Sequence, residues 1–218
     1  MKIFAVARNY GPMAGGLDGR ELSDAPMGDG AEALIYEMPD SSIVRTRQPF
    51  FVPDFAGETR LMPTLVLRIG KLGKGIASRF ADRYFDGRTM GCAAVATDML
   101  RALRREGLPW FPAISFDKAC MLGDFRGMDE PMPALFEMTC GADTLRYDTE
   151  MIRHSAGEVL QKLSRDITVK SGDMILLALH PLGLPARIGD KLTIAAVTDN
   201  NDDNDNNEQH PLLEINIR

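Results

Sequence analysis

The stretch Leu61-Met62-Pro63-Thr64-Leu65-Val66-Leu67-Arg68-Ile69 is the part of the sequence that decides the fold class. Its side chains follow the two-residue period of a β-strand, in which successive residues point to opposite faces. One face carries Leu65, Leu67 and Ile69, and the other carries Met62, Thr64, Val66 and Arg68. We therefore predict a strand in which Arg68 shares a face with Met62 and Thr64.

Most of the other regular segments also have strand patterns, at residues 1–7, 33–36, 132–139, 144–147, 174–179, 191–198 and 211–217. Only two helices are predicted. One begins at Thr97 or Asp98, either of which is a candidate N-cap, and ends before Gly107. The other opens with a capping box, Ser155 followed by Glu158. Many strands with few helices predict an α+β fold dominated by mixed or antiparallel sheet.

The composition excludes several classes of partner and compartment. The 218 residues carry a net charge of −6 without a basic stripe in the sequence, so we expect neither nucleic acid nor a membrane as a partner. No apolar run approaches the roughly 18 residues of a membrane span, and the apolar N-terminus is too short for a signal peptide. The widely spaced Cys92, Cys120 and Cys140 are expected to be free thiols in a reducing compartment, and we predict a cytoplasmic protein.

Two polar segments lack a regular period. Residues 11–30 are rich in glycine and are predicted to form a loop or flap. Residues 199–208 consist almost entirely of Asp and Asn, with a spacing faintly like that of a calcium loop. The turn glycine of such a loop is missing, and its twelfth position carries His210 where a glutamate is needed. We therefore favour a solvated hairpin loop there over a calcium site.

The segment Gly87-Arg88-Thr89-Met90-Gly91-Cys92-Ala93-Ala94-Val95-Ala96-Thr97-Asp98 resembles the G-Y-T-x-G-N-D-x-T-A-R-D signature of the fumarylacetoacetate hydrolase family. Further matches follow in the family's order, at Arg8-Asn9-Tyr10, Ile69-Gly70-Lys71, Gly107-Leu108-Pro109-Trp110, Ser115-Phe116-Asp117, Gly172-Asp173 and Ile188-Gly189-Asp190. The resemblance implies a mixed β roll or sandwich-like barrel with a few flanking helices. It divides the chain into an N-terminal lobe and flap at 1–52 and a core at 53–218, with one continuous domain as the alternative.

The resemblance also implies a divalent cation, usually Mg²⁺ or Mn²⁺, held by acidic side chains against a β-dicarbonyl substrate. Two of these acids come from an H-x-E-x-E strand and the third from the G-N-D segment. The matching positions here carry Met62, Thr64 and Ala93. Since hard dications require anionic oxygen ligands, we expect no metal and no other cofactor.

The other catalytic positions implied by the resemblance are also substituted. The lysine that opens the K-S-F-D motif is Ile114, and a His–Glu dyad that activates water aligns with Met13 and Gly16. The lysine of a K-P element is Met38, and the T-G-T-P turn that cradles substrate is replaced at residues 177–180. The cation ligands, the lysine, the dyad and the turn work together as one catalytic unit. Because all of them are substituted here, the sequence predicts a protein that does not carry out the family's reaction.

We therefore expect a fumarylacetoacetate hydrolase-like pseudoenzyme that acts as a binding or partner subunit. The alternative is a divergent hydrolase, tautomerase or decarboxylase for a small keto acid, with a rebuilt metal-free site around Arg60, Arg68 and His180. The competing interpretation of these residues is an arginine paired with a local acid and a histidine in a turn. The resemblance further implies a homodimer, and a paralogous partner is conceivable. For Asp98 we predict helix capping or an internal salt bridge.

Overall fold

The computed structural model describes residues 1–11, 33–197 and 211–218. Met13, Gly16 and the run 199–208 lie outside the described residues, so the interpretations placed on them stay predictions. Among the described residues, no helix is long and apolar enough to cross a membrane.

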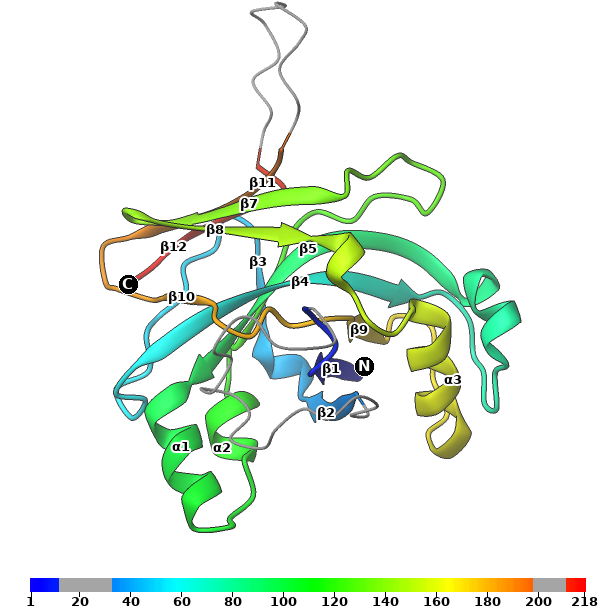
Figure 1. Ribbon diagram of the computed structural model, residues 1–218, viewed down its shortest axis with the longest axis horizontal. Coiled ribbons are helices and arrows are strands. Elements are labelled where there is room, and N and C mark those ends of the chain that lie inside the picture. The colour runs from blue at the N-terminus through cyan, green and yellow to red at the C-terminus, as the bar shows by residue number, and fades with distance from the viewer. Residues whose placement is uncertain (12–32, 198–210) are drawn as a thin grey trace, which may run out of the picture.

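Two curled β-sheets form the body of the protein (Figure 1). The larger sheet has eight strands: β1 (Ile3–Ala7), β2 (Leu34–Met38), β3 (Ile43–Arg45), β4 (Thr59–Ile69), β5 (Phe85–Ala96), β6 (Cys120–Leu122), β9 (Met174–Leu176) and β10 (Leu184–Pro185). Its order is β2-β1-β9-β4-β5-β6-β3, and β10 pairs with β4. The smaller sheet has the order β12-β11-β7-β8, from β7 (Leu135–Cys140), β8 (Asp143–Asp148), β11 (Lys191–Ala196) and β12 (Leu213–Asn216).

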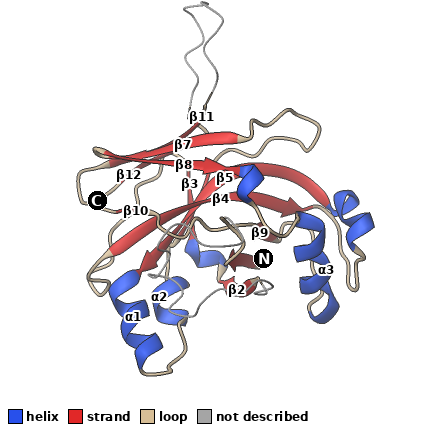
Figure 2. Ribbon diagram, viewed as in Figure 1, coloured by secondary structure: helices blue, strands red, loops and turns tan. Residues whose placement is uncertain are grey.

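Few helices accompany the sheets (Figure 2). The α-helices are α1 (Thr97–Arg105), α2 (Phe111–Ile114) and α3 (Ala156–Asp166), and the 3₁₀ helices are η1 (Asp40–Ser42), η2 (Ser78–Tyr84) and η3 (Thr149–Met151). In Figure 1, α1 and α2 lie near one end of the larger sheet and α3 lies at the other. This arrangement confirms the α+β class, with mixed, curled sheets and few helices, that is expected from the sequence.

The central strand β4 shows the predicted alternation. Met62 and Val66 belong to one buried cluster, which also contains the inner side chains of the smaller sheet. Leu67 and Ile69 belong to a second cluster, which packs against α3 and η2. Because both faces of β4 are covered, its side chains are almost all buried, and the strand separates the two parts of the core.

The two predicted helices are present as α1 and α3, whereas α2 and the 3₁₀ helices were not predicted. Ser155 accepts a hydrogen bond from Glu158 N at 3.2 Å, while the Glu158 carboxylate accepts one from Ser155 N at 2.8 Å, so the capping box is confirmed. The N-cap of α1 is Ala96, which has no side-chain hydrogen bond, so the capping role expected of Thr97 or Asp98 is wrong. Asp98 instead pairs with Arg101 at 2.7 Å.

The strands on either side of residue 52 belong to one sheet. β1 pairs with β9 in parallel, and β3 pairs in parallel with β6, so strands from residues 1–52 lie in the same sheet as strands from residues 53–218. Ile3, Met38 and Phe50 are fully buried in the same cluster as Met62. The N-terminal segment therefore contributes directly to the surroundings of the candidate site.

Candidate functional site

The site implied by the sequence resemblance lies where β4 and β5 run antiparallel beside each other. Met62 lies opposite Ala93, and Thr64 lies opposite Gly91. All three implied ligand positions are buried, with 1% of Met62 exposed and none of Thr64 or Ala93. The structure thus brings Met62, Thr64 and Ala93 together, as the resemblance requires of ligands to one ion.

The Thr64 hydroxyl is hydrogen-bonded on both its donor and its acceptor side within the fold. It accepts a hydrogen bond from Ala178 N at 3.2 Å and donates one to Leu65 O at 3.2 Å. Ala178 belongs to residues 177–180, the segment that aligns with the substrate turn, and this segment continues along β4. The hydroxyl therefore ties that segment to the strand.

The implied lysine position, Ile114, lies at the end of α2 and is 7% exposed. It lines an apolar surface groove of about 360 Å³ together with Tyr36, Trp110 and Phe111. Met38, at the other implied lysine position, is fully buried in β2. Neither position supplies a positive charge to a substrate.

His180 lies beside the implied metal site. Its backbone N–H donates to Pro63 O at 3.0 Å, which places it against β4 between Met62 and Thr64 in sequence. The imidazole Nδ1 accepts a hydrogen bond from Leu182 N at 3.2 Å. Burial lowers the pKa of His180 to about 4, so the ring is neutral near pH 7, with its proton on Nε2.

Two tyrosines complete an aromatic stack with His180. The Tyr10 ring lies 4.8 Å from the His180 ring and 4.7 Å from the Tyr147 ring. Tyr147 donates to Ala178 O at 2.9 Å and accepts from Leu65 N at 3.2 Å, while Tyr10 accepts from Asp148 N at 2.8 Å. Burial is the main cause that raises the pKa of both phenols, so neither is a base at neutral pH.

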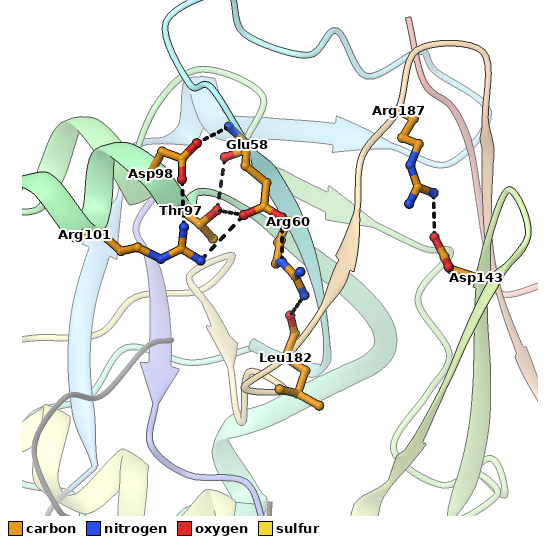
Figure 3. Close-up of polar contacts among 8 residues, drawn as sticks. All are labelled: Glu58, Arg60, Thr97, Asp98, Arg101, Asp143, Leu182 and Arg187. Carbon is orange, nitrogen blue, oxygen red and sulfur yellow. Dashed lines mark hydrogen bonds and ion pairs between the residues drawn. The ribbon is translucent and has the colours of Figure 1, made fainter. Parts of the chain in front are cut away.

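Arg60 reaches the backbone of Leu182, two residues after His180 in the sequence, as Figure 3 shows. Its NH1 donates to Leu182 O at 3.2 Å, and its Nε donates to Glu58 Oε1 at 3.1 Å. Glu58 Oε2 also accepts from Thr97 Oγ1 at 2.9 Å. Arg60 and His180 therefore contact the same residue, Leu182, and the start of α1 is linked to them through Glu58.

Arg68 lies apart from this group. It pairs with Asp86 at 2.6 Å, and its guanidinium lies over the Phe125 ring at 4.9 Å. Eight residues of strand separate it from Arg60, roughly 26 Å at the usual rise per residue. The two arginines therefore do not form a common anion site.

The three cysteines are free and buried. Burial raises the pKa of Cys120 to about 12 and that of Cys140 to about 11, and it is the main cause of a raised pKa at Cys92. Since the thiolate is the nucleophilic form, none of them is activated for covalent catalysis.

Sequence and structure comparisons agree on the relatives of this chain. The profile described as fumarylacetoacetate (FAA) hydrolase C-terminal matches residues 2–177. The chain belongs to the fumarylacetoacetate hydrolase family. It is 29% identical over 179 residues to the mitochondrial oxaloacetate tautomerase fahd-1 of Caenorhabditis elegans, covering 80% of each chain. It is 24% identical to the oxaloacetate tautomerase YcgM of Escherichia coli, covering 88% of this chain and 87% of the relative.

A solved structure supports the same fold. Fumarylpyruvate hydrolase from Pseudomonas aeruginosa, in complex with Mn²⁺ and pyruvate, superposes with a TM-score of 0.82. The match covers 100% of this chain and 89% of the other, at 18% sequence identity. This likeness concerns the fold, and the chemistry of this family member must be argued from its own residues.

The residues at the implied cation position do not fit the family's dication. Met62 offers a thioether, Thr64 a neutral hydroxyl that is already bonded, and Ala93 a methyl group. Within the described ranges, no group of three or more His, Cys, Asp or Glu side chains could hold a metal ion. Mg²⁺ and Mn²⁺ need several anionic or carbonyl oxygens, which this donor set does not provide.

The residues that match the family motifs have structural roles here. A Cβ on Gly91 would lie 2.6 Å from Val66 Cγ2 and 2.8 Å from Met121 O, so only glycine lets the strands pack this closely. Asn9 is fully buried, and its amide bonds to Leu177 O at 2.8 Å and to both backbone groups of His154. These positions explain why the fold was predictable from motifs, whereas the Tyr147 contribution to the stack has no signal in the sequence.

Proposed function

We propose that this family member works without the family's dication and does not carry out metal-dependent hydrolysis, isomerisation or decarboxylation. In this proposal it is a binding or partner subunit. The observation that carries the proposal is the pairing of Met62 with Ala93 beside Thr64, whose hydroxyl is bonded within the fold. A dication placed there would lose its water ligands and gain no anionic oxygen in return.

Metal binding is the first test. Metal analysis of the purified protein, and its thermal unfolding with added Mg²⁺, Mn²⁺ or a chelator, should show neither bound ion nor a shift in Tm. A ligand that binds only the folded state, present at about 100 times its Kd, raises the free energy of unfolding by about 2.7 kcal/mol. Metal binding of that strength would therefore be seen as a clear rise in Tm. Stoichiometric metal, or a clear stabilisation by Mn²⁺, would overturn the proposal.

A partner role has its own test. We propose a homodimer, or a heteromer in which this chain accompanies a metal-binding paralogue. Light scattering of the purified chain distinguishes a monomer from a dimer. Co-purification from the native cell, followed by identification of the bound protein, separates a heteromeric partner role from a self-contained binding role.

The second candidate function is metal-free tautomerisation of a small keto acid, the substrate class in the names of two relatives. The observation that favours it is the neutral His180 on the turn beside Tyr10. In this version the His180 Nε2–H donates a hydrogen bond to the carbonyl oxygen as it becomes an enol oxygen. Solvent water takes the proton from the neighbouring carbon, and the enol oxygen gains its proton from water.

Turnover of oxaloacetate, followed by the absorbance of its enol, tests this candidate. The E. coli relative named as an oxaloacetate tautomerase is the positive control. The rate should fall in His180→Ala and stay unchanged in Arg68→Ala, because Arg68 is paired with Asp86 away from the turn. No rate above that of buffer, or equal rates in both variants, excludes tautomerisation at His180.

A further inference from the structure

One end of the molecule joins two segments that lie far apart in the sequence. The loop of residues 70–77 and η2 pack against α3 and the residues that follow it, on the right of Figure 1. Gly73 and Val169 exchange both backbone hydrogen bonds, at 3.0 and 2.9 Å, and Gly75 N donates to Ser164 O at 2.7 Å. We call the surface formed by residues 68–86 and 155–170 the basic face.

The basic face has the opposite charge from the rest of the chain. Its two segments contain eight Lys and Arg against four Asp and Glu, a net charge of +4. The whole chain carries −6, so the remaining residues together carry −10. Five of the basic residues are exposed, and within the described part of the chain none of them forms an ion pair: Lys71, Lys74, Arg79, Arg83 and Lys170. The fold thus brings together basic residues from two segments, 68–86 and 155–170, that lie far apart in the sequence.

Large apolar side chains are exposed among these charges. Leu72 is 69% exposed and stands between Lys71 and Lys74. Phe80 is 40% exposed, with the guanidinium groups of Arg79 and Arg83 at 4.8 and 5.2 Å from its ring centre. Basic side chains around exposed apolar ones are typical of surfaces that bind the headgroup region of a bilayer.

The same face is hollowed. A groove of about 550 Å³ lies between Gly75–Ala77 and the side of α3 that carries Glu158, Gln161, Lys162 and Arg165. The Glu158 carboxylate accepts hydrogen bonds from the Ser155 backbone N–H and hydroxyl in the capping box. These bonds lower the pKa of Glu158, so it keeps its negative charge at neutral pH. The rim of the groove thus carries both signs of charge, with Lys162 and Arg165 beside Glu158.

We propose that the basic face is a docking surface for a bilayer that contains anionic lipid. The exposed Leu72 decides for lipid over nucleic acid, because an aliphatic side chain gains from insertion among acyl chains and gains little from a phosphate backbone. The proposal is independent of any reaction at His180. It also differs from the expectation of no membrane partner, which rested on the net charge of −6 and on the absence of a basic stripe in the linear sequence.

Sedimentation with vesicles tests the proposal. The full chain should bind vesicles of phosphatidylcholine with about one-third phosphatidylserine, should not bind phosphatidylcholine alone, and should lose affinity as salt is added. Because the protein as a whole is acidic, general electrostatic attraction does not produce this pattern. Absence of binding to the anionic vesicles overturns the proposal.

Matched variants locate the surface. Each basic residue near an anionic membrane contributes about fivefold to binding, so the double variant Lys71→Glu, Lys74→Glu should lose at least about 25-fold. The control Arg45→Glu, Arg105→Glu makes the same charge change at exposed positions on β3 and α1 and should change binding less than about threefold. Equal losses in both double variants would overturn the assignment of this face.

The variant Leu72→Ser separates lipid from other polyanions. Removing the inserted side chain should lower vesicle binding about tenfold while leaving the charge of the face unchanged. Binding to duplex DNA or heparin as tight as that to anionic vesicles, with no effect of Leu72→Ser on either, would mean a general polyanion surface and would overturn the lipid assignment.

Discussion

Returning a carboxylate to position 62 tests whether the former ligand position is now part of the core. Met62 is 1% exposed and lies opposite Ala93, inside the cluster that joins the two sheets. In Met62→Glu, the nearest basic side chain on this strand face is Arg60, two residues away, which already donates to Glu58 and to Leu182 O. Arg68, six residues away in the other direction, is paired with Asp86. The new carboxyl group must therefore be buried charged, or be protonated.

The cost of that burial follows from the pKa of the new group. A glutamate with an ordinary pKa of about 4.3 must be kept neutral in the core, and each pH unit above that value costs about 1.4 kcal/mol. At about pH 8 the total is about 5 kcal/mol, and at about pH 5 it is about 1 kcal/mol. The folded-state pKa is raised, so the loss is complete above it and is relieved as pH falls toward the unfolded value. Since domains are stable by about 5–15 kcal/mol, the loss at high pH is large.

Urea unfolding of Met62→Glu and Met62→Gln at both pH values measures this difference. Met62→Gln has the same shape as the glutamate without the charge, so its loss of a few kcal/mol should be the same at both pH values. Met62→Glu should be less stable than Met62→Gln by about 5 kcal/mol at the higher pH and by only about 1 kcal/mol at the lower pH. The reasoning is refuted if Met62→Glu matches the wild type at high pH, or if Mn²⁺ raises the stability of the wild type.

Three further outcomes follow from the contacts around this core. Tyr147→Phe removes the hydroxyl that donates to Ala178 O, and the free energy of unfolding in urea should fall by about 1–3 kcal/mol. The depressed pKa of His180 predicts that stability falls by about 3 kcal/mol as pH drops from its unfolded value near 6.5 through about 4, and that the fall is smaller in His180→Phe. Ser155→Ala breaks the capping box with Glu158 and should lower the stability by about 1 kcal/mol, seen as a lower Tm without loss of fold.

The fold was predictable where local patterns carry the information. Residue spacing predicts the two faces of β4, the extent of α1 and the capping box of α3, and the structure confirms all three. The strand β5 was not predicted, because Phe85–Ala96 contains glycines and a run of small residues in place of an alternating pattern. Its length is set by pairing along the whole of β4, which is a property of the sheet and not of the segment.

The candidate site was predictable in position and not in its contacts. Residue spacing on one strand was enough to place Met62 with Thr64, and the motif match added Ala93 across the strand pair. The link from Arg60 through Leu182 to His180 depends on a turn more than a hundred residues away, so no local pattern announces it. Arg68 shares the strand face, yet the length of the strand puts it at the far end, where Asp86 holds it.

The position of β1 within the larger sheet has a consequence for synthesis on the ribosome. β1 lies between β2 and β9, and its parallel partner β9 ends at Leu176. At about 5–20 residues per second, roughly eight to thirty-five seconds pass between the emergence of the first strand and that of its partner. During that interval Phe4 and Val6, both buried in the finished protein, have one strand edge without its partner. Parallel pairing between the two ends of a chain is slow to form, and until it forms the apolar edge of β1 is a site at which nascent chains can associate with one another.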